Sequence, residues 1–303
     1  MTVAILAAAA IAPAPGAPHT VDDAAVAAVP VRARKTMSRG ALLATAAMDA
    51  LVRSLPHGGL ALAALRDAAC FVGVGASGGS IGELHAMLRA SMDGARWSLT
   101  RFGGPGLAAC NPLLAFQLMN NFTMAHAAIH AGVGTGPCGA LFSRGAGTVH
   151  ALAEAIAAVE DGDAAVAIAG GADSAHHPVT LDELRRGGWD GAPGEGAAML
   201  AIGRGPGPRI VRCEIVAADA PLPDGPLVVI ADAALRARLD ARAEGRRELL
   251  EVLDAGAATG ECLAAGPALA WHAALAVVAR AGRATVVTAD VDGALGVVAL
   301  EAA

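Results

Sequence analysis

The stretch GPCGALFSRGAGTVHALAEAIAAVEDGDAAVAIAGGAD, residues 136–173, decides the fold of this chain. A Gly-Pro pair and a turn of small residues lead into an alanine-rich run over 148–161, and the apolar run 165–169 then ends at Gly170-Gly171. The alanine-rich run is long enough for a helix. A short apolar run bounded by glycines is typical of a buried strand. The stretch therefore predicts a tight turn, a helix and a strand in this order.

The same alternation extends outward over the rest of the chain. Strand-like runs lie at 3–6, 69–74, 165–169, 198–202, 227–231 and 284–288, and helix-like runs lie at 39–55, 80–91, 113–132, 148–161, 235–254 and 267–281. Such alternation predicts an α/β fold with mostly parallel, buried strands. The Gly/Pro cluster at 203–208 is the one clear internal linker, and it divides a larger first part from a smaller second part.

The composition excludes several classes of function. The chain has 303 residues, of which 55% are hydrophobic and 3% aromatic, and its formal net charge is −6. Few aromatic residues and an acidic balance argue against nucleic-acid binding. The five cysteines are scattered without metal-ligand spacing, so we expect buried free thiols in a reducing cytosol and no metal site. The cysteines are Cys70, Cys110, Cys138, Cys213 and Cys262. We also expect no cofactor.

The apolar start of the chain is interpreted as a strand. The run over residues 2–11 has no basic segment before it and is followed by Pro13, unlike a secretory signal. No other stretch is free enough of glycine, proline and charge to be a membrane span. We therefore expect a first buried strand in a cytoplasmic protein.

A second signature links the chain to a known family. Gly194-Glu195-Gly196-Ala197-Ala198-Met199-Leu200 follows the stretch at 136–173, and this order and spacing resembles the N-terminal half of the β-ketoacyl synthases of fatty acid and polyketide synthesis. Weaker similarities follow at 264–266, Ala-Ala-Gly before a helix-like run, and at 292–296, a glycine-rich turn before the last apolar run.

The resemblance implies a fold and a division of the chain. The expected architecture is an α/β, thiolase-like, five-layered α/β/α/β/α pseudo-dimer. Residues 1–205 would form the N-terminal thiolase-like half, and residues 206–303 a shortened C-terminal thiolase-like half, together in one compact unit.

The family's catalytic residues have no counterparts here. Its members carry a nucleophilic cysteine in the turn before the long helix, but counting back from Gly170-Gly171 without a gap places Gly145 at this position. They also carry two histidines and a lysine in the second half. This chain has no histidine between 178 and 271, His272 falls inside a helix-like run, and the only lysine is Lys35. We therefore expect no catalytic residue of the family.

An alternative enzyme remains open. Cys138 follows the Gly-Pro pair, Ser143 lies two positions before Gly145, and His150 begins the next helix-like run. A relocated nucleophile at Cys138 or Ser143, or at Cys262 in a remodelled pocket, would give an acyltransferase, a thiolase-like enzyme or a hydrolase. A homodimeric scaffold that only binds a carrier protein is a third hypothesis.

A ketosynthase-like chain without a nucleophile resembles a chain-length factor, the β subunit of type II polyketide ketosynthases. The resemblance implies a pseudoenzyme in polyketide or polyene biosynthesis that pairs with a catalytic ketosynthase as a heterodimer and closes the far end of its acyl tunnel. An acyl carrier protein is the second expected partner. The tunnel or interface candidates implied by the resemblance are Ala76, Leu114, Phe116, Met119 and Phe122.

Two further motifs receive non-catalytic interpretations. The glycine-rich run 73–79 imitates a dinucleotide fingerprint, but the resemblance places it beside an acyl pocket. His176-His177 is interpreted as a solvated loop pair, because no third metal ligand is near it in sequence.

Overall fold

The computed structural model describes residues 3–14, 19–76 except 59–61, 78–245, 252–289 and 293–303. Its main strands form two five-stranded arrays with one shared pattern. The first array has the order β1 (Ala4–Ile11), β7 (Glu195–Gly203), β6 (Val166–Ser174), β2 (Ala69–Val74) and β5 (Cys138–Phe142). The second has the order β8 (Arg209–Ala217), β12 (Ala294–Glu301), β11 (Arg283–Ala289), β9 (Leu227–Ile230) and β10 (Val252–Asp254).

The two arrays repeat each other in strand direction. In each, the first two neighbouring pairs are antiparallel and the last two are parallel. The expectation of mostly parallel strands is therefore wrong, because the strands that follow one another near the end of each half pair as antiparallel neighbours. A single antiparallel Cα pairing, Ala4 with Arg209, joins β1 to β8 and so connects the arrays. The repeat confirms the expected pseudo-dimer.

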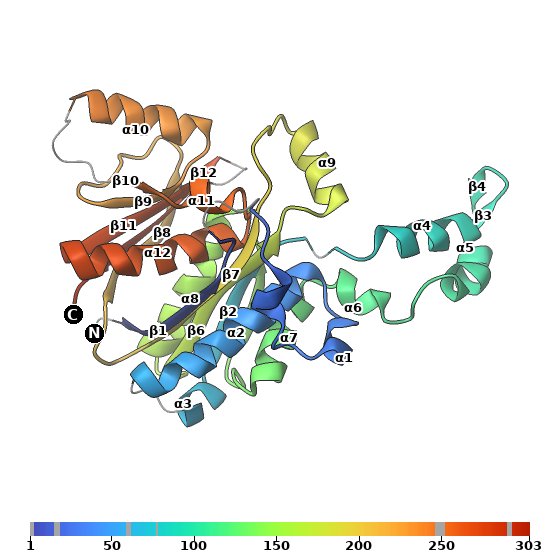
Figure 1. The fold of residues 1–303 in the computed structure, drawn as a ribbon, viewed down its shortest axis with the longest axis horizontal. Helices are drawn as coiled ribbons and strands as arrows, with labels where there is room; N and C mark the ends of the chain where they lie inside the picture. Colours follow the sequence, from blue (N-terminus) through green and yellow to red (C-terminus); the bar gives the residue numbers. More distant parts are fainter. Residues whose placement is uncertain (1–2, 15–18, 59–61, 77, 246–251, 290–292) are drawn as a thin grey trace.

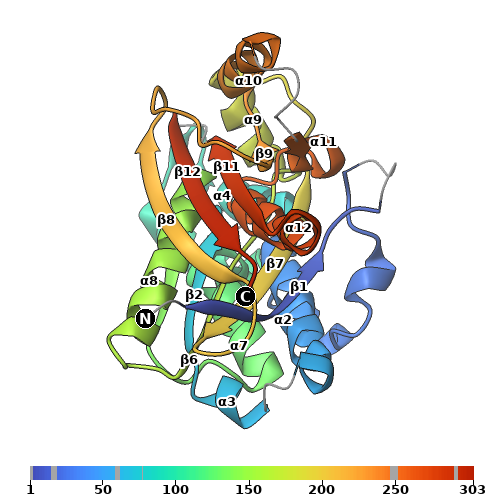
Figure 2. The same cartoon turned by 90° about the vertical axis from the view of Figure 1, so that its left-hand side faces the viewer.

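Helices form three layers around the two arrays (Figures 1 and 2). The middle layer consists of α8 (Val149–Glu160) and α12 (Ala265–Ala281), whose buried residues share one core with strands of both arrays. The outer face of the first array is covered by α2 (Arg39–Gly58) and α7 (Asn121–Ala131), and the outer face of the second by α10 (Ala233–Gly245). The five-layered α/β/α/β/α architecture is therefore confirmed.

Small side chains allow this close layering. Ala155 and Ala158 of α8 are buried in the central core, as are Ala268 and Ala274 of α12. An alanine face lets a helix backbone approach a sheet closely, and the interior is then filled at normal packing density.

A long segment projects from the body, and we call residues 79–118 the arm (Figure 1). It contains α4 (Ile81–Ala90), the hairpin β3 (Met92–Asp93) and β4 (Arg96–Trp97), α5 (Leu99–Arg101), the π-type turn η2 (Phe102–Gly106) and α6 (Leu114–Leu118). Many of its large apolar side chains are exposed, a feature that marks interaction surfaces. They are Ile81, Leu88, Trp97, Leu99, Leu107, Leu113 and Leu118.

Two predicted helices need correction. The run 113–132 is not one helix, because Met119 adopts an extended backbone (φ −94°, ψ 117°) that separates α6 from α7. The run 235–254 is not one helix either, since α10 ends at Gly245 and Val252–Asp254 forms β10; residues 246–251 lie outside the described residues.

The shorter elements complete the described chain. They are η1 (Asp23–Val26), α1 (Val31–Arg34), α3 (Leu62–Arg66), η3 (Ala146–Thr148), α9 (Pro178–Arg186) and α11 (Ala255–Thr259). The expected boundary between residues 205 and 206 falls between β7 and β8, and the division into two halves stays a prediction. Among the described helices, none combines the length and hydropathy needed to cross a membrane.

Candidate functional site

The turn between β5 and α8, which we call the elbow (residues 143–148), has a backbone built around glycine. Gly145 is buried with φ 145° and ψ −114°, a conformation that side-chain-bearing residues rarely adopt. The Ser143 hydroxyl donates to the Gly145 carbonyl oxygen (2.9 Å) and accepts from the Gly145 N–H (3.1 Å). The elbow is therefore a well-formed turn, and its expected nucleophile position has no side chain.

A threonine fixes the elbow to the second half of the molecule. Thr148 Oγ1 lies 2.8 Å from the carbonyl oxygen of Ala264, just before α12, and 3.0 Å from Ser143 Oγ. Thr148 also fills the space that a Cβ on Gly73 would take. The Ala-Ala-Gly segment that the sequence singled out thus lies directly against the elbow.

The alternative nucleophiles do not converge on a base. Ser143 is 4% exposed and is occupied by its bonds within the elbow. Cys138 begins β5, at the strand end away from the elbow, and is exposed. His150 is exposed on α8, and no hydrogen bond joins it to Ser143 in the described part of the chain. Burial raises the pKa of Cys262, which disfavours its thiolate. A nucleophilic role for Cys138 or Ser143 stays a prediction.

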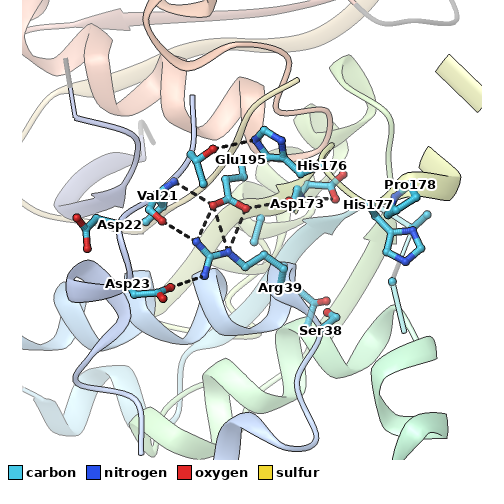
Figure 3. Close-up of a pocket in the computed structure, with 18 residues that line it drawn as sticks. Val21, Asp22, Asp23, Ser38, Arg39, Asp173, His176, His177, Pro178 and Glu195 are labelled. Atoms are coloured by element: carbon cyan, nitrogen blue, oxygen red, sulfur yellow. Dashed lines mark hydrogen bonds and ion pairs between the residues drawn. The ribbon is translucent and has the colours of Figure 1, made fainter. Parts of the chain in front are cut away.

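A cavity of about 750 Å³ lies at the carboxyl ends of β2 and β6 (Figure 3). Its wall is formed by residues 20–23, by residues 38–40 at the start of α2, by the glycine-rich loop after β2, and by the end of β6 with the loop to α9. Ala76 lines it, and the glycine-rich run therefore borders a pocket. Its volume suits a small-molecule site.

An ion pair holds one wall of this cavity together. Arg39 at the start of α2 binds Glu195 at the start of β7 with Nη2 2.6 Å from Oε1 and Nε 3.0 Å from Oε2. Arg39 Nη2 also donates to the Val21 carbonyl oxygen, while Glu195 accepts from the Val21 N–H and the Ser174 hydroxyl. Figure 3 shows these bonds converging on Arg39 and Glu195.

Burial and the opposite charge of the partner act against each other on the pKa values of this pair. Glu195 is only 2% exposed, and burial by itself would raise its pKa, but the hydrogen bonds and charge of Arg39, with the bonds from Ser174 and Val21, together lower the pKa. The hydrogen bond to Glu195 in turn raises the pKa of Arg39. Both groups are therefore charged, and the pair ties the segment at residues 20–23 to the sheet.

A buried carboxyl separates the cavity from the elbow. Asp173, at the end of β6, is 4% exposed and lines the cavity, while its Oδ2 lies 3.4 Å from the Ala264 N–H nitrogen. Its Oδ1 accepts from the Ser174 N–H at 2.7 Å. Burial raises the pKa of Asp173 to about 7, although these two N–H groups act in the opposite direction.

The interpretation of His176-His177 as a solvated pair is wrong. Both rings are half-buried and line the cavity. His176 Nε2 lies 3.3 Å from the carbonyl oxygen of His19, and His177 Nε2 lies 3.1 Å from that of Gly79. The pair was misjudged because its carbonyl partners lie about a hundred or more positions away in the chain.

The tunnel and interface candidates fall into separate places. Leu114 is buried and lines an apolar hollow of about 420 Å³ in the arm. Phe116 faces another side of α6 and packs edge to face on Phe122, with ring centroids 5.0 Å apart. Met119 is exposed. The structure thus brings Phe116 and Phe122 together and leaves Leu114 with the arm, while Ala76 stays at the cavity.

Several residues of the site were not predicted from the sequence. Arg39 and Glu195 are 156 positions apart, so no short-range sequence pattern predicts their ion pair. Glu195 does belong to the quoted signature at 194–200. Asp173 likewise stands at the end of a quoted run. Charged residues embedded in otherwise apolar, glycine-rich runs were the available signal, because such residues are rarely buried without a partner.

A family model matches more than half of this chain. Residues 17–202 match the family model described as "Beta-ketoacyl synthase, N-terminal domain". A search of curated proteins finds no match.

Solved structures match over the full length of this chain. A type II PKS acyl-carrier protein in complex with its ketosynthase bound to the hexaketide (AntDE:AntF) matches with a TM-score of 0.73 and 13% identity, over 100% of this chain and 99% of that one. The ishigamide ketosynthase/chain length factor matches with a TM-score of 0.69 and 20% identity, over 100% and 99%. A β-ketoacyl synthase from Burkholderia phymatum STM815 matches with a TM-score of 0.67 and 15% identity, also over 100% and 99%. These likenesses show a thiolase-like fold.

Proposed function

The chain belongs to the β-ketoacyl synthase family, and we propose that it is a non-catalytic subunit of the chain-length-factor kind. It would pair with a catalytic ketosynthase in type II polyketide or polyene biosynthesis, bound the acyl tunnel of that partner, and work with an acyl carrier protein in the cytoplasm. The observation that carries the proposal is Gly145 at the tip of a fully formed elbow.

The chemistry of condensation gives this observation its weight. Carbon–carbon bond formation on an acyl chain needs a nucleophile to hold the chain and groups that stabilise the developing negative charge. Gly145 supplies no nucleophile. The only histidine after residue 177 is His272, inside α12, and burial lowers its pKa. The elbow fold is thus retained while the groups that would do chemistry on it are replaced.

Two surfaces support a partner subunit. β5 is the edge strand of the first array, and Phe142 at its end is 59% exposed. An unpaired edge strand is a template for another chain. The arm adds the exposed apolar side chains named above, and a surface of this kind is stable when another subunit covers it.

The hollow in the arm supports a tunnel role. Leu114 shares it with Met87, Phe102, Leu107 and Leu118, all large and apolar. Asn111 also lines the hollow, with its Oδ1 accepting from the Leu113 N–H, and the mainly apolar lining suits a hydrocarbon chain. Leu114 therefore becomes the residue whose size would set the space available to a growing chain.

Changing the size of Leu114 is expected to change product length. Leu114→Trp adds bulk to the hollow, so the co-expressed complex should release shorter chains, whereas Leu114→Ala should allow longer ones. The measurement is mass spectrometry of the products of each complex. Val211→Trp is the matched control, because Val211 is exposed on β8, outside the arm, and does not line the hollow. An unchanged product distribution with an intact complex would contradict the tunnel role of Leu114.

The enzyme alternative makes a different prediction. A subunit without a nucleophile should gain no stable acyl adduct from a simple acyl thioester, and Ser143 should not react with a fluorophosphonate. Intact-mass spectrometry of the treated protein checks both reactions, with Cys138→Ala as the control for thiol exchange at an exposed cysteine. Stoichiometric labelling of Ser143, or a Cys138 acyl-enzyme that turns over, would instead establish an acyltransferase, thiolase-like or hydrolytic activity.

A further inference from the structure

The cavity beside Asp173 is acidic. Four carboxyl groups line it, those of Asp22, Asp23, Asp173 and Glu195, and among the described lining residues Arg39 is the only arginine or lysine. The guanidinium of Arg39 is occupied by Glu195 and by Asp23, whose Oδ1 lies 3.3 Å from Nη1. The positive charge of Arg39 is thus fully matched within the wall, and the remaining carboxyls leave the cavity with a net negative charge.

Asp173 is the buried member of this set. In the described structure it receives hydrogen bonds from two backbone N–H groups and forms no ion pair. A carboxylate has room for about four hydrogen bonds, and a buried one without a cation is costly. A positively charged group in the cavity would offset this cost, and nothing in the described wall provides one.

The two histidines add acceptors. Each points Nε2 at a carbonyl oxygen, which only accepts, so Nε2 carries the proton of the neutral ring. Nδ1 is then an acceptor, and the hydrogen bonds found among the described residues involve only Nε2 of His176 and His177. The carboxylates and the two Nδ1 atoms are thus acceptors within the wall, and an ammonium group brings three donors and no acceptor.

We propose that this cavity binds a primary ammonium group carried on an apolar body. The carboxyl and imidazole acceptors receive the ammonium donors near Asp173, and the apolar part of the ligand lies against Val21, Ala76 and Ala172. The same wall opposes a carboxylate or a phosphate. The site goes beyond the proposed subunit role, because it belongs to this chain whether or not a partner is bound.

Three probes of one chain length test the proposal: octylamine, octanol and octanoate. Isothermal titration of the full chain at pH 8 is expected to give one octylamine per chain, bound about tenfold more tightly than octanol, with octanoate the weakest. Octanoate binding as tightly as octylamine, or octylamine binding no tighter than octanol, would overturn the proposal. The ranking is read on the unmodified protein, so it does not depend on a variant that folds.

The variant Asp173→Asn tests whether the preference for octylamine depends on this carboxyl group. This variant is expected to lose the tenfold preference for octylamine while octanol binding stays unchanged. Asp161→Asn, an exposed position after α8, is the matched control for general attraction of a cation to an acidic protein. A preference that survives Asp173→Asn, or that falls equally in Asp161→Asn, would exclude the cavity as the site. Neither result bears on partner pairing or product length, which are measured separately.

Discussion

Arg39→Met is expected to lower the free energy of unfolding by about 3–5 kcal/mol, because it leaves a buried charge without its partner. Glu195 is 2% exposed, and its remaining hydrogen bonds come from Val21 and Ser174. Those two bonds do not replace the charge of a bidentate guanidinium. Urea unfolding at pH 7, followed by circular dichroism, measures the difference.

Two variants make this result specific. Arg53→Met removes an arginine from the same helix, but Arg53 is 57% exposed in its pair with Asp49, so we expect a loss of only about 0–1 kcal/mol. The double change Arg39→Met with Glu195→Gln removes both charges and should be less destabilised than Arg39→Met alone. Equal losses in Arg39→Met and Arg53→Met would show that the buried pair does not stabilise the cavity wall.

Asp173→Asn is expected to change stability in a strongly pH-dependent way. Burial raises the pKa of this carboxyl from its usual 3.8 to about 7 in the folded chain, with N–H groups of Ser174 and Ala264 opposing the shift and Glu261 adding to it. Between these two pH values the folded chain holds a proton that the unfolded chain has released. The folded state therefore loses stability as pH rises from about 4 to about 7, by on the order of 4 kcal/mol in total.

Asparagine cannot ionise, so the variant should escape this loss. At pH 4 the variant and the original chain should be of similar stability, whereas at pH 8 Asp173→Asn should be more stable by a few kcal/mol. Urea unfolding at both pH values measures this, with Asp161→Asn as the exposed control. A difference that is the same at pH 4 and pH 8 would mean that Asp173 ionises normally in the folded protein.

Most of the fold was predictable because its signals are local. The run 69–74 coincides with β2, and the run 267–281 lies within α12. Both elements were predictable because the pattern of apolar residues within each run is typical of a strand or a helix. The order of turn, helix and strand in 136–173 was likewise correct. Family resemblance supplied what periodicity does not, namely that two arrays stack around a shared helical layer.

The errors in the fold have physical causes. The apolar composition of 113–132 continues through Met119, but a change to extended backbone at one residue suffices to end a helix there. β8 was missed because the charged residues Arg209, Arg212 and Glu214 interrupt its apolar run, and β10 because only three residues form it. Such elements are specified by their neighbours in the sheet rather than by their own sequence.

The candidate site was predictable only in part. Gly145 and the glycine-rich loop follow from spacing along the chain. The cavity wall does not, because it depends on contacts between residues far apart: Arg39 with Glu195, and Asp173 with Ala264. Contacts between such distant residues depend on how the layers pack, and they produce no periodic pattern in the sequence.

The central claim is that this chain is one subunit of a ketosynthase pair. Its most direct test is co-expression with a cysteine-containing ketosynthase from the same gene neighbourhood, followed by purification through a tag on one chain and native mass spectrometry. We expect a stable one-to-one heterodimer in which the β5 edge and the arm are protected from hydrogen exchange. A homodimer or monomer of this chain that ignores the ketosynthase would contradict it.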